Sequence, residues 1–235
     1  AGRAEAVDRV AQAYQAVAAA LTARAEEAAG TTMGEVLDAT AAMAGDPELI
    51  GDVKARVLQG QEPTFAVDRA TKEYIDLFTA AGGYLAERVT DLRSVRDRVI
   101  SRLAGLPEPG VPALAEPSVV VAQDLAPADT AALDLGKVLA IVIEQGGPTG
   151  HTAIIAGQLG IPCIVRVSGA ADLVDGQVVA VDAAAGTVTI DPDDDVRARA
   201  EARGAALERL ASDHGDGATA DGHRVQLLAN IGTAE

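Results

Sequence analysis

Aromatic side chains are nearly absent from this sequence. Its 235 residues include no tryptophan, three tyrosines and two phenylalanines, whereas apolar residues make up 49% of the chain. A hydrophobic core must therefore be built mainly from alanine, valine, leucine and isoleucine. The length allows a sizeable core and predicts two domains.

Cysteine and long apolar runs are also scarce. Cys163 is the only cysteine, so no disulfide can form within the chain, which is typical of the reducing cytoplasm. No apolar run approaches the roughly 20 residues that span a bilayer, and no signal-peptide pattern opens the sequence. We therefore expect a cytoplasmic protein that does not enter a membrane.

Basic residues are outnumbered by acidic ones. Lysine and arginine total 19 against 35 aspartates and glutamates, which gives a formal net charge of −16. Because binding to a nucleic-acid backbone needs a basic face, this balance excludes that class of partner. It favours a partner with a basic docking surface, although an acidic surface can also serve solubility alone.

The first 105 residues predict a helical bundle. Apolar residues recur at spacings of three and four along Gly2–Ala29, as on one face of a helix. The Thr31-Thr32 pair is expected to cap the next helix and Pro47 to begin the one after. Residues 84–103 are the most regular segment and predict a single helix. Its outer, solvated face is expected to carry Arg88, Arg93, Arg96, Arg98 and Arg102.

The character of the sequence changes after residues 106–117, which contain four prolines and predict a linker. Short β-branched runs alternate with helical pieces over residues 118–192 and predict a compact α/β domain. The expected strands are 119–122, 138–143, 163–167, 178–181 and 187–190.

The last part of the chain is more polar. Residues 193–212 predict a charged linker helix, and 213–235 a linker followed by the start of another strand. The apolar residues expected to face inward from the helix are Val196, Ala200, Leu207 and Leu210. The fold class predicted for the whole chain is an all-α helical bundle joined to an α/β domain.

A glycine-rich stretch at residues 146–152, Gly-Gly-Pro-Thr-Gly-His-Thr, lies between a predicted strand and a predicted helix. Paired glycines let a backbone approach a ligand closely, and Thr149 is the expected N-cap. His151 would then lie in the first helical turn, where free N–H groups and a positive partial charge favour an anion and a neutral, nucleophilic imidazole. On the pattern alone, a histidine in a first helical turn is more often a solvated or capping residue.

Residues 146–156, followed by Gly-Ile-Pro at 160–162, resemble the phosphohistidine motif of enzyme I, the phosphoenolpyruvate–protein phosphotransferase of the bacterial sugar phosphotransferase system. Similar motifs occur in the mobile domains of pyruvate phosphate dikinase and phosphoenolpyruvate synthase. The resemblance implies that His151 carries a phosphoryl group and that Thr130 hydrogen-bonds its ring. The residues expected around the phosphate are Gly146, Gly147, Thr149, Gly150 and Thr152.

Two departures from the family pattern concern the same motif. Gly150 stands where the family usually has serine, and Gly157 where it usually has arginine. The missing hydroxyl and the missing cation would weaken phosphate contacts, which puts the transfer rate or partner docking in doubt while leaving the nucleophile in place.

The resemblance extends over the order of segments in the amino-terminal half of enzyme I. It implies that the helical part docks the histidine phosphocarrier protein while the α/β domain swivels. Residues 221–232 resemble the first strand of the family's phosphoenolpyruvate-binding barrel, so we expect the chain to start late and to stop just inside that domain. The candidate docking residues, which could instead be core or merely solvated, are Glu35, Asp38, Met43, Leu85 and Arg88.

The expected activity is phosphoryl transfer from phosphoenolpyruvate, through His151, to a histidine of the carrier protein in sugar uptake. This chain alone is expected to exchange phosphoryl with the carrier but not to react with phosphoenolpyruvate, because the residues for that substrate and for Mg²⁺ belong to the absent domain. We expect a monomer with no metal site of its own. His214, His223 and the acidic residues 191–195 are assigned no chemistry.

Two alternatives remain open. The chain could be the enzyme-I-like part of another multidomain phosphotransfer protein; a dikinase is disfavoured because its central domain has no carrier-docking bundle. It could also be a degenerate module that docks the carrier without transferring phosphoryl, as Gly150 and Gly157 would suggest.

Overall fold

The computed structural model describes residues 2–147, 150–212, 221 and 223. The chain divides into two compact units, one of Ala1–Gln177 with Ala183–Thr187 and the other of Val178–Asp182 with Val188–Glu235. Among the described helices, none is long and apolar enough to cross a membrane. Each unit is described by itself.

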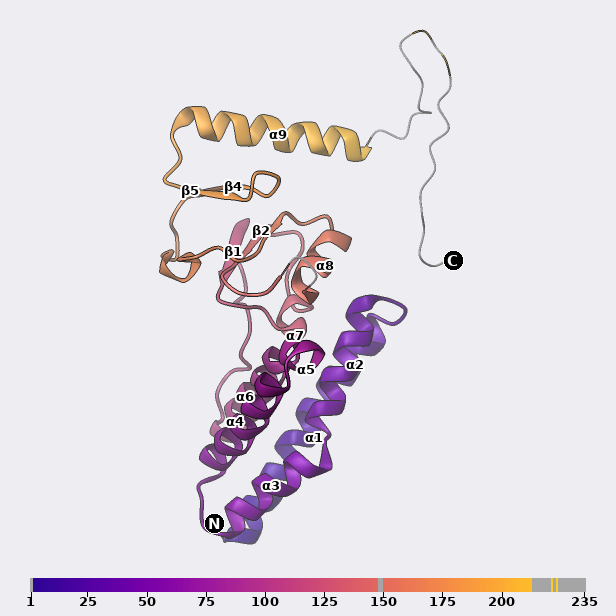
Figure 1. The fold of residues 1–235 in the computed structure, drawn as a ribbon, viewed down its shortest axis with the longest axis vertical. Coiled ribbons are helices and arrows are strands. Elements are labelled where there is room, and N and C mark those ends of the chain that lie inside the picture. The colour runs from indigo at the N-terminus through magenta and orange to yellow at the C-terminus, as the bar shows by residue number, and fades with distance from the viewer. Residues whose placement is uncertain (1, 148–149, 213–220, 222, 224–235) are drawn as a thin grey trace. The chain divides into compact units, whose positions relative to one another are not determined.

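The first unit begins with a helical bundle (Figure 1). Helix α1 packs against α2, α3 and α6, and α4 packs against α3 and α6. Its core contains one aromatic residue, Tyr14, among valines, leucines and alanines, as the composition predicts. The helices are α1 (Arg3–Glu27), α2 (Thr32–Ala44), α3 (Pro47–Leu58), α4 (Pro63–Ala81), α5 (Gly83–Glu87) and α6 (Val89–Ala104).

The predicted starts of two bundle helices are confirmed. The Thr31 hydroxyl accepts a hydrogen bond from the Gly34 N–H at 3.2 Å and caps α2. Helix α3 begins at Pro47, and the Asp46 carboxylate accepts from the N–H groups of Glu48 at 2.7 Å and Leu49 at 3.0 Å. The cap matters because the first N–H groups of a helix have no partner within it.

Removing this cap tests its contribution to stability. Asp46→Ala is expected to lower the free energy of unfolding by about 1 kcal/mol, the usual cost of losing an N-cap. Urea unfolding followed by circular dichroism measures it. Asp38→Ala removes the same charge from an exposed position on α2 and should change stability by less than about 0.5 kcal/mol. Equal effects of the two substitutions would contradict the capping role.

The predicted single helix over residues 84–103 is wrong. The chain forms α5 and α6, with Arg88 at the junction. The expectation that Arg88 is solvated is also wrong: it is 5% exposed, and its Nη1 lies 2.9 Å from Oδ2 of Asp91. Its Nε donates to the Tyr84 hydroxyl at 3.0 Å. These contacts hold the guanidinium at the corner between α5 and α6.

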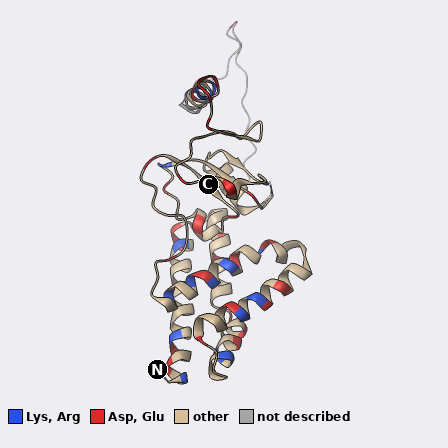
Figure 2. Ribbon diagram, turned by 90° about the vertical axis from the view of Figure 1, so that its left-hand side faces the viewer, with Lys and Arg blue, Asp and Glu red and all other residues tan. Residues whose placement is uncertain are grey.

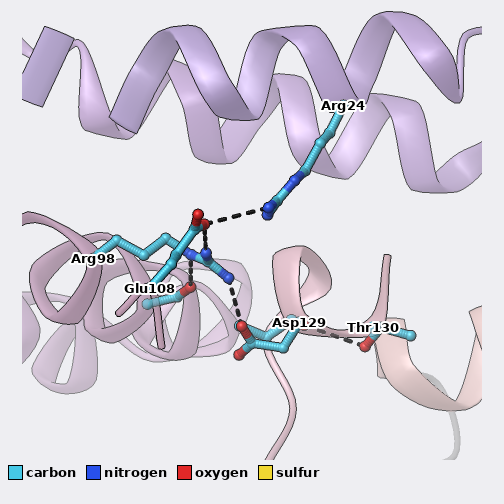
Figure 3. Close-up of polar contacts among 7 residues, drawn as sticks. Arg24, Arg98, Glu108, Asp129 and Thr130 are labelled. Atoms are coloured by element: carbon cyan, nitrogen blue, oxygen red, sulfur yellow. Dashed lines mark hydrogen bonds and ion pairs between the residues drawn. The ribbon is translucent and has the colours of Figure 1, made fainter. Parts of the chain in front are cut away.

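Arg98 is a second arginine that is buried rather than solvated, at 4% exposure. Figure 3 shows carboxylates from two other segments turned toward it. Its Nη2 lies 2.5 Å from Oδ1 of Asp129, and its Nη1 donates to Glu108, which also pairs with Arg24 of α1. Burial raises the pKa of Asp129, and Arg98 opposes this. The network joins the bundle to the proline-containing linker and to α7 (Pro127–Thr130).

A small parallel sheet follows, so the predicted fold class of a bundle plus an α/β part is confirmed. Strand β2 (Val138–Ile143) lies between β1 (Ser118–Ala122) and β3 (Cys163–Ile164). Helix α8 (His151–Gln158) connects β2 to β3, and its Ala156 packs in the core with Ile141 and Ile143. Strand β3 ends earlier than predicted because Arg166 has φ of 61°, which is incompatible with a strand.

Beyond β3 come the 3₁₀ turn η1 (Ala170–Asp172) and then the second unit, which contains the paired strands β4 (Val179–Asp182) and β5 (Thr187–Ile190) and helix α9 (Asp194–Ser212). Asp193 caps α9 by accepting from the Val196 N–H at 2.8 Å. Two side chains predicted to face inward from this helix, those of Ala200 and Leu207, are exposed.

Some predictions fall outside the described residues. They concern the strand predicted within residues 224–229, His214 and Pro148.

Candidate functional site

His151 is the first residue of α8, so the structure places it in the first helical turn, as predicted. The predicted N-cap was wrong: Gly150 takes that position, and its carbonyl accepts the first helical hydrogen bond from Ile154 N–H at 3.1 Å. Thr149 lies outside the described residues. The N–H groups that begin α8 have no acceptor within the helix and give this end a positive partial charge.

Glycine suits two positions of the loop before His151. Gly146 has φ of 84°, which other residues rarely adopt. Gly150 donates its N–H to the Gly147 carbonyl at 2.9 Å, and a Cβ added at Gly150 would lie 3.1 Å from that oxygen. A side chain at residue 150 would therefore press on the turn.

The His151 side chain is half-buried and lines a cavity of about 450 Å³. The walls come from α6, the glycine loop, the start of α8 and the segments that follow β1 and β3. Gly146, Gly147, Gly150 and Thr152 line the same cavity, so the structure brings the described members of the predicted phosphate-binding set together. In the described part of the chain, no three His, Cys, Asp or Glu side chains are grouped to hold a metal ion.

Two threonines assigned to the site make other contacts. The Thr152 hydroxyl, 6% exposed, donates to the Leu125 carbonyl at 3.0 Å, so its proton is not free for a phosphate oxygen. The Thr130 hydroxyl donates to the Ala126 carbonyl at 3.2 Å. Among the described contacts there is no hydrogen bond from Thr130 to His151, contrary to expectation, because the hydroxyl is used by the backbone of its own short helix. The hydrogen bond of Thr152 fixes the segment after β1 beside α8.

Cations that were not predicted for the site lie around the cavity. Arg166, directly after β3, donates its Nε–H to the Gly146 carbonyl at 3.1 Å. Arg93 of α6 also lines the cavity with an exposed side chain. The one sequence signal for Arg166 is a charge inside the apolar run of residues 163–167, which was interpreted as a strand.

Three acidic residues, Glu87, Asp91 and Asp124, line the cavity, and the last two are engaged by neighbours. Asp91 is 1% exposed; burial raises the pKa of its carboxyl, and the hydrogen bond from Arg88 opposes this. Burial works to lower the pKa of Arg88, but hydrogen bonds to Asp91 and Tyr84 raise it overall, so we take the two as an ion pair at neutral pH. Asp124 accepts a hydrogen bond from the Thr90 hydroxyl, at 2.5 Å.

Comparison with known proteins agrees with this arrangement. A family model described as the PEP-utilising enzyme, N-terminal, matches residues 1–88, and one described as the PEP-utilising enzyme, mobile domain, matches residues 114–186. The second match contains the glycine loop, His151 and Arg166.

The chain belongs to the family of PEP-utilising enzymes. It is 49% identical over 225 residues to the phosphoenolpyruvate-protein phosphotransferase of Streptomyces coelicolor, covering 95% of this chain and 40% of that protein. It is 36% identical over 223 residues to the enzyme of the same name from Enterococcus faecalis, covering 91% of this chain and 39% of that protein. The chain thus spans about 40% of the length of these curated relatives.

A solved structure agrees with the fold. The solution structure of an enzyme I protein superposes with a TM-score of 0.65 at 29% identity, covering 88% of this chain and 86% of that one. The resemblance to the amino-terminal part of enzyme I, inferred from the motif and the order of segments, is thereby confirmed.

Within this family fold, the candidate docking residues have different environments. Glu35 and Asp38 are exposed on α2, and Leu85 of α5 is 40% exposed. Met43 is half-buried against the cluster of Ile75, Val89 and Leu92. Arg88 does not belong to an exposed docking face, because its guanidinium is buried against Asp91. Acidic and basic residues are interspersed along the helices α1–α6 (Figure 2).

Proposed function

We propose that His151 is a phosphoryl carrier that takes the group from a phosphoenolpyruvate-binding part of the intact enzyme and passes it to a histidine of a carrier protein. The observation that carries the proposal is the position of its imidazole, at the start of α8 and beside a glycine loop and a cavity that Arg93 and Arg166 line. The similarity to phosphoenolpyruvate-protein phosphotransferases supports the same reaction.

In the exchange with the carrier, a ring nitrogen of His151 attacks the phosphorus of the carrier's phosphohistidine. The new P–N bond forms as the old one breaks, and the carrier imidazole leaves with the electron pair. Such transfers require alignment and charge stabilisation more than covalent assistance from the protein. The free N–H groups at the start of α8 and the nearby guanidinium groups supply positive charge to the phosphoryl oxygens.

The reaction with phosphoenolpyruvate belongs to the same proposal. Because the chain spans about 40% of its relatives, we place the groups that bind phosphoenolpyruvate and Mg²⁺ in the portion of those relatives that it does not match. Sugar transport as the final purpose and a cytoplasmic location stay predictions.

Incubation with phosphorylated histidine phosphocarrier protein tests the proposal. We expect intact-mass measurement to show the addition of one phosphoryl group that is lost in acid, and peptide mapping to place it on His151. Incubation with phosphoenolpyruvate and Mg²⁺ alone is the control and should leave the mass unchanged. If the phosphorylated carrier leaves no acid-labile label, the carrier role is wrong.

The second candidate is a module that docks the carrier without receiving phosphoryl. The hydroxyl of Thr152 is committed to Leu125 and residue 150 has no side chain, so two expected phosphate contacts are missing. Titration with the unphosphorylated carrier, followed by NMR, distinguishes the two functions when combined with the labelling experiment. A docking module would show binding shifts on the helical bundle and no label.

A further inference from the structure

Arg166 occupies an unusual backbone conformation for a long side chain. Its φ of 61° is in the left-handed region, which is unfavourable for a residue with a Cβ and persists where the surroundings enforce it. Its side chain is exposed and lines the cavity of His151. The structure therefore keeps an arginine where glycine would be easier to accommodate.

The parallel sheet explains how Arg166 reaches the glycine loop. Strands β2 and β3 pair in register, with Val142 beside Ile164, so their carboxyl ends lie next to each other. The Val167 N–H continues this pairing by donating to the Ile143 carbonyl at 3.1 Å. Because the glycine loop starts just after β2, the residue that follows β3 is brought beside it, and ligands commonly bind at this end of such sheets.

The contacts of the guanidinium leave part of it free. Its Nε–H is used by the Gly146 carbonyl, and Nη2 lies 3.6 Å from where a Cβ of Gly147 would be. Within the described ranges, Nη1 and Nη2 have no hydrogen bond or ion pair. Of the three carboxylates that line the same cavity, those of Asp91 and Asp124 are engaged by Arg88 and Thr90, and that of Glu87 has no described ion pair with Arg166. Two pairs of N–H donors therefore remain available on a side chain anchored to the loop.

We infer that Arg166 positions the glycine loop and supplies the guanidinium that contacts the phosphoryl group carried by His151. The inference rests on the proposed function and adds a residue to it. An arginine is suited to this because its planar group can anchor through Nε while its terminal nitrogens bind two phosphoryl oxygens. Helix α8 itself offers no cation, since residue 157 is glycine and the helix contains no lysine or arginine.

The test compares Arg166→Gly and Arg166→Lys with the unaltered chain. The rate of labelling by limiting phosphorylated carrier is measured, together with the urea midpoint of unfolding. Arg166→Gly should be labelled at least about tenfold more slowly, without a lower urea midpoint, because glycine accepts the positive φ. The Arg166→Lys variant should be labelled faster than Arg166→Gly. Millimolar guanidinium added to Arg166→Gly should restore part of the lost rate. Asp191→Gly, at another positive φ of 45°, should leave the rate unchanged.

The outcomes separate this inference from the proposed function. Normal labelling of both the unaltered chain and Arg166→Gly overturns the role of Arg166 and leaves His151 as the carrier. Slow labelling of Arg166→Gly that neither lysine nor guanidinium restores also overturns it, because that result indicates a structural effect on the loop alone. Absence of label on the unaltered chain refutes both.

Discussion

Replacing His151 with alanine is expected to abolish labelling of the chain by the phosphorylated carrier. The substitution removes the only imidazole among the described residues that line the cavity, and no other side chain there is placed to form a phosphohistidine. Loss of a nucleophile typically lowers the rate by about 10⁴-fold or more, so we expect no detectable label in the time that labels the unaltered chain completely. Intact-mass measurement over a time course checks this.

The same experiment needs a matched histidine outside the cavity. His223→Ala removes an imidazole from an exposed position in the second unit and should be labelled at the normal rate. His151→Ala should keep its free energy of unfolding to within about 0.5 kcal/mol, because the ring is half-buried and makes no hydrogen bond among the described contacts. Label retained by His151→Ala would show that another residue is the phosphoryl acceptor.

Local sequence patterns were sufficient to predict most of the elements. Proline and cap residues mark the starts of α2 and α3, and the β-branched run at 138–143 coincides with β2. These features depend on a few neighbouring residues, so they can be read without knowing the tertiary structure. The glycine loop before His151 is predictable for the same reason, because the positive φ of Gly146 is one that few other residues adopt.

The predictions that were wrong concern side chains whose surroundings come from residues far away in the sequence. Arg88 and Arg98 have the helical spacing of solvated residues, yet Asp91 and Asp129 hold them in buried pairs. The partner of Arg98 is 31 residues away and belongs to α7, so no local pattern signals the pairing. The position of Arg166 likewise follows from the pairing of β3 with β2 and from a positive φ. Neither feature can be predicted from the local sequence.

Replacing Arg88 with methionine is expected to cause the largest loss of stability among the changes considered. Methionine retains much of the apolar stem, but Asp91, which is 1% exposed, loses the guanidinium 2.9 Å away. Removing one partner of a buried ion pair costs about 3–5 kcal/mol, because the other charge remains buried without compensation. Urea unfolding at pH 7 measures this. Arg93→Met, from an exposed position on α6, should cost less than about 0.5 kcal/mol.

The pH dependence of that loss identifies its cause. Burial already raises the pKa of Asp91 above its ordinary 3.8, and without Arg88 the opposing effect is gone, so the folded variant binds a proton more readily than the unfolded chain. The stabilisation from protonation is fully present below pH 3.8 and is lost as pH rises through the folded-state pKa. The deficit of Arg88→Met relative to the unaltered chain should therefore shrink on acidification from pH 7.

Replacing both partners separates the unpaired charge from the lost packing. Arg88→Met combined with Asp91→Leu leaves no buried charge, and apolar replacement of a whole buried pair is often neutral or stabilising. We therefore expect the double variant to regain most of the stability lost by Arg88→Met, and its remaining deficit to be insensitive to acidification. If the double variant is as unstable as Arg88→Met, the lost stability comes from packing at the α5–α6 corner, including the contact of Arg88 with Tyr84, and not from the unpaired charge.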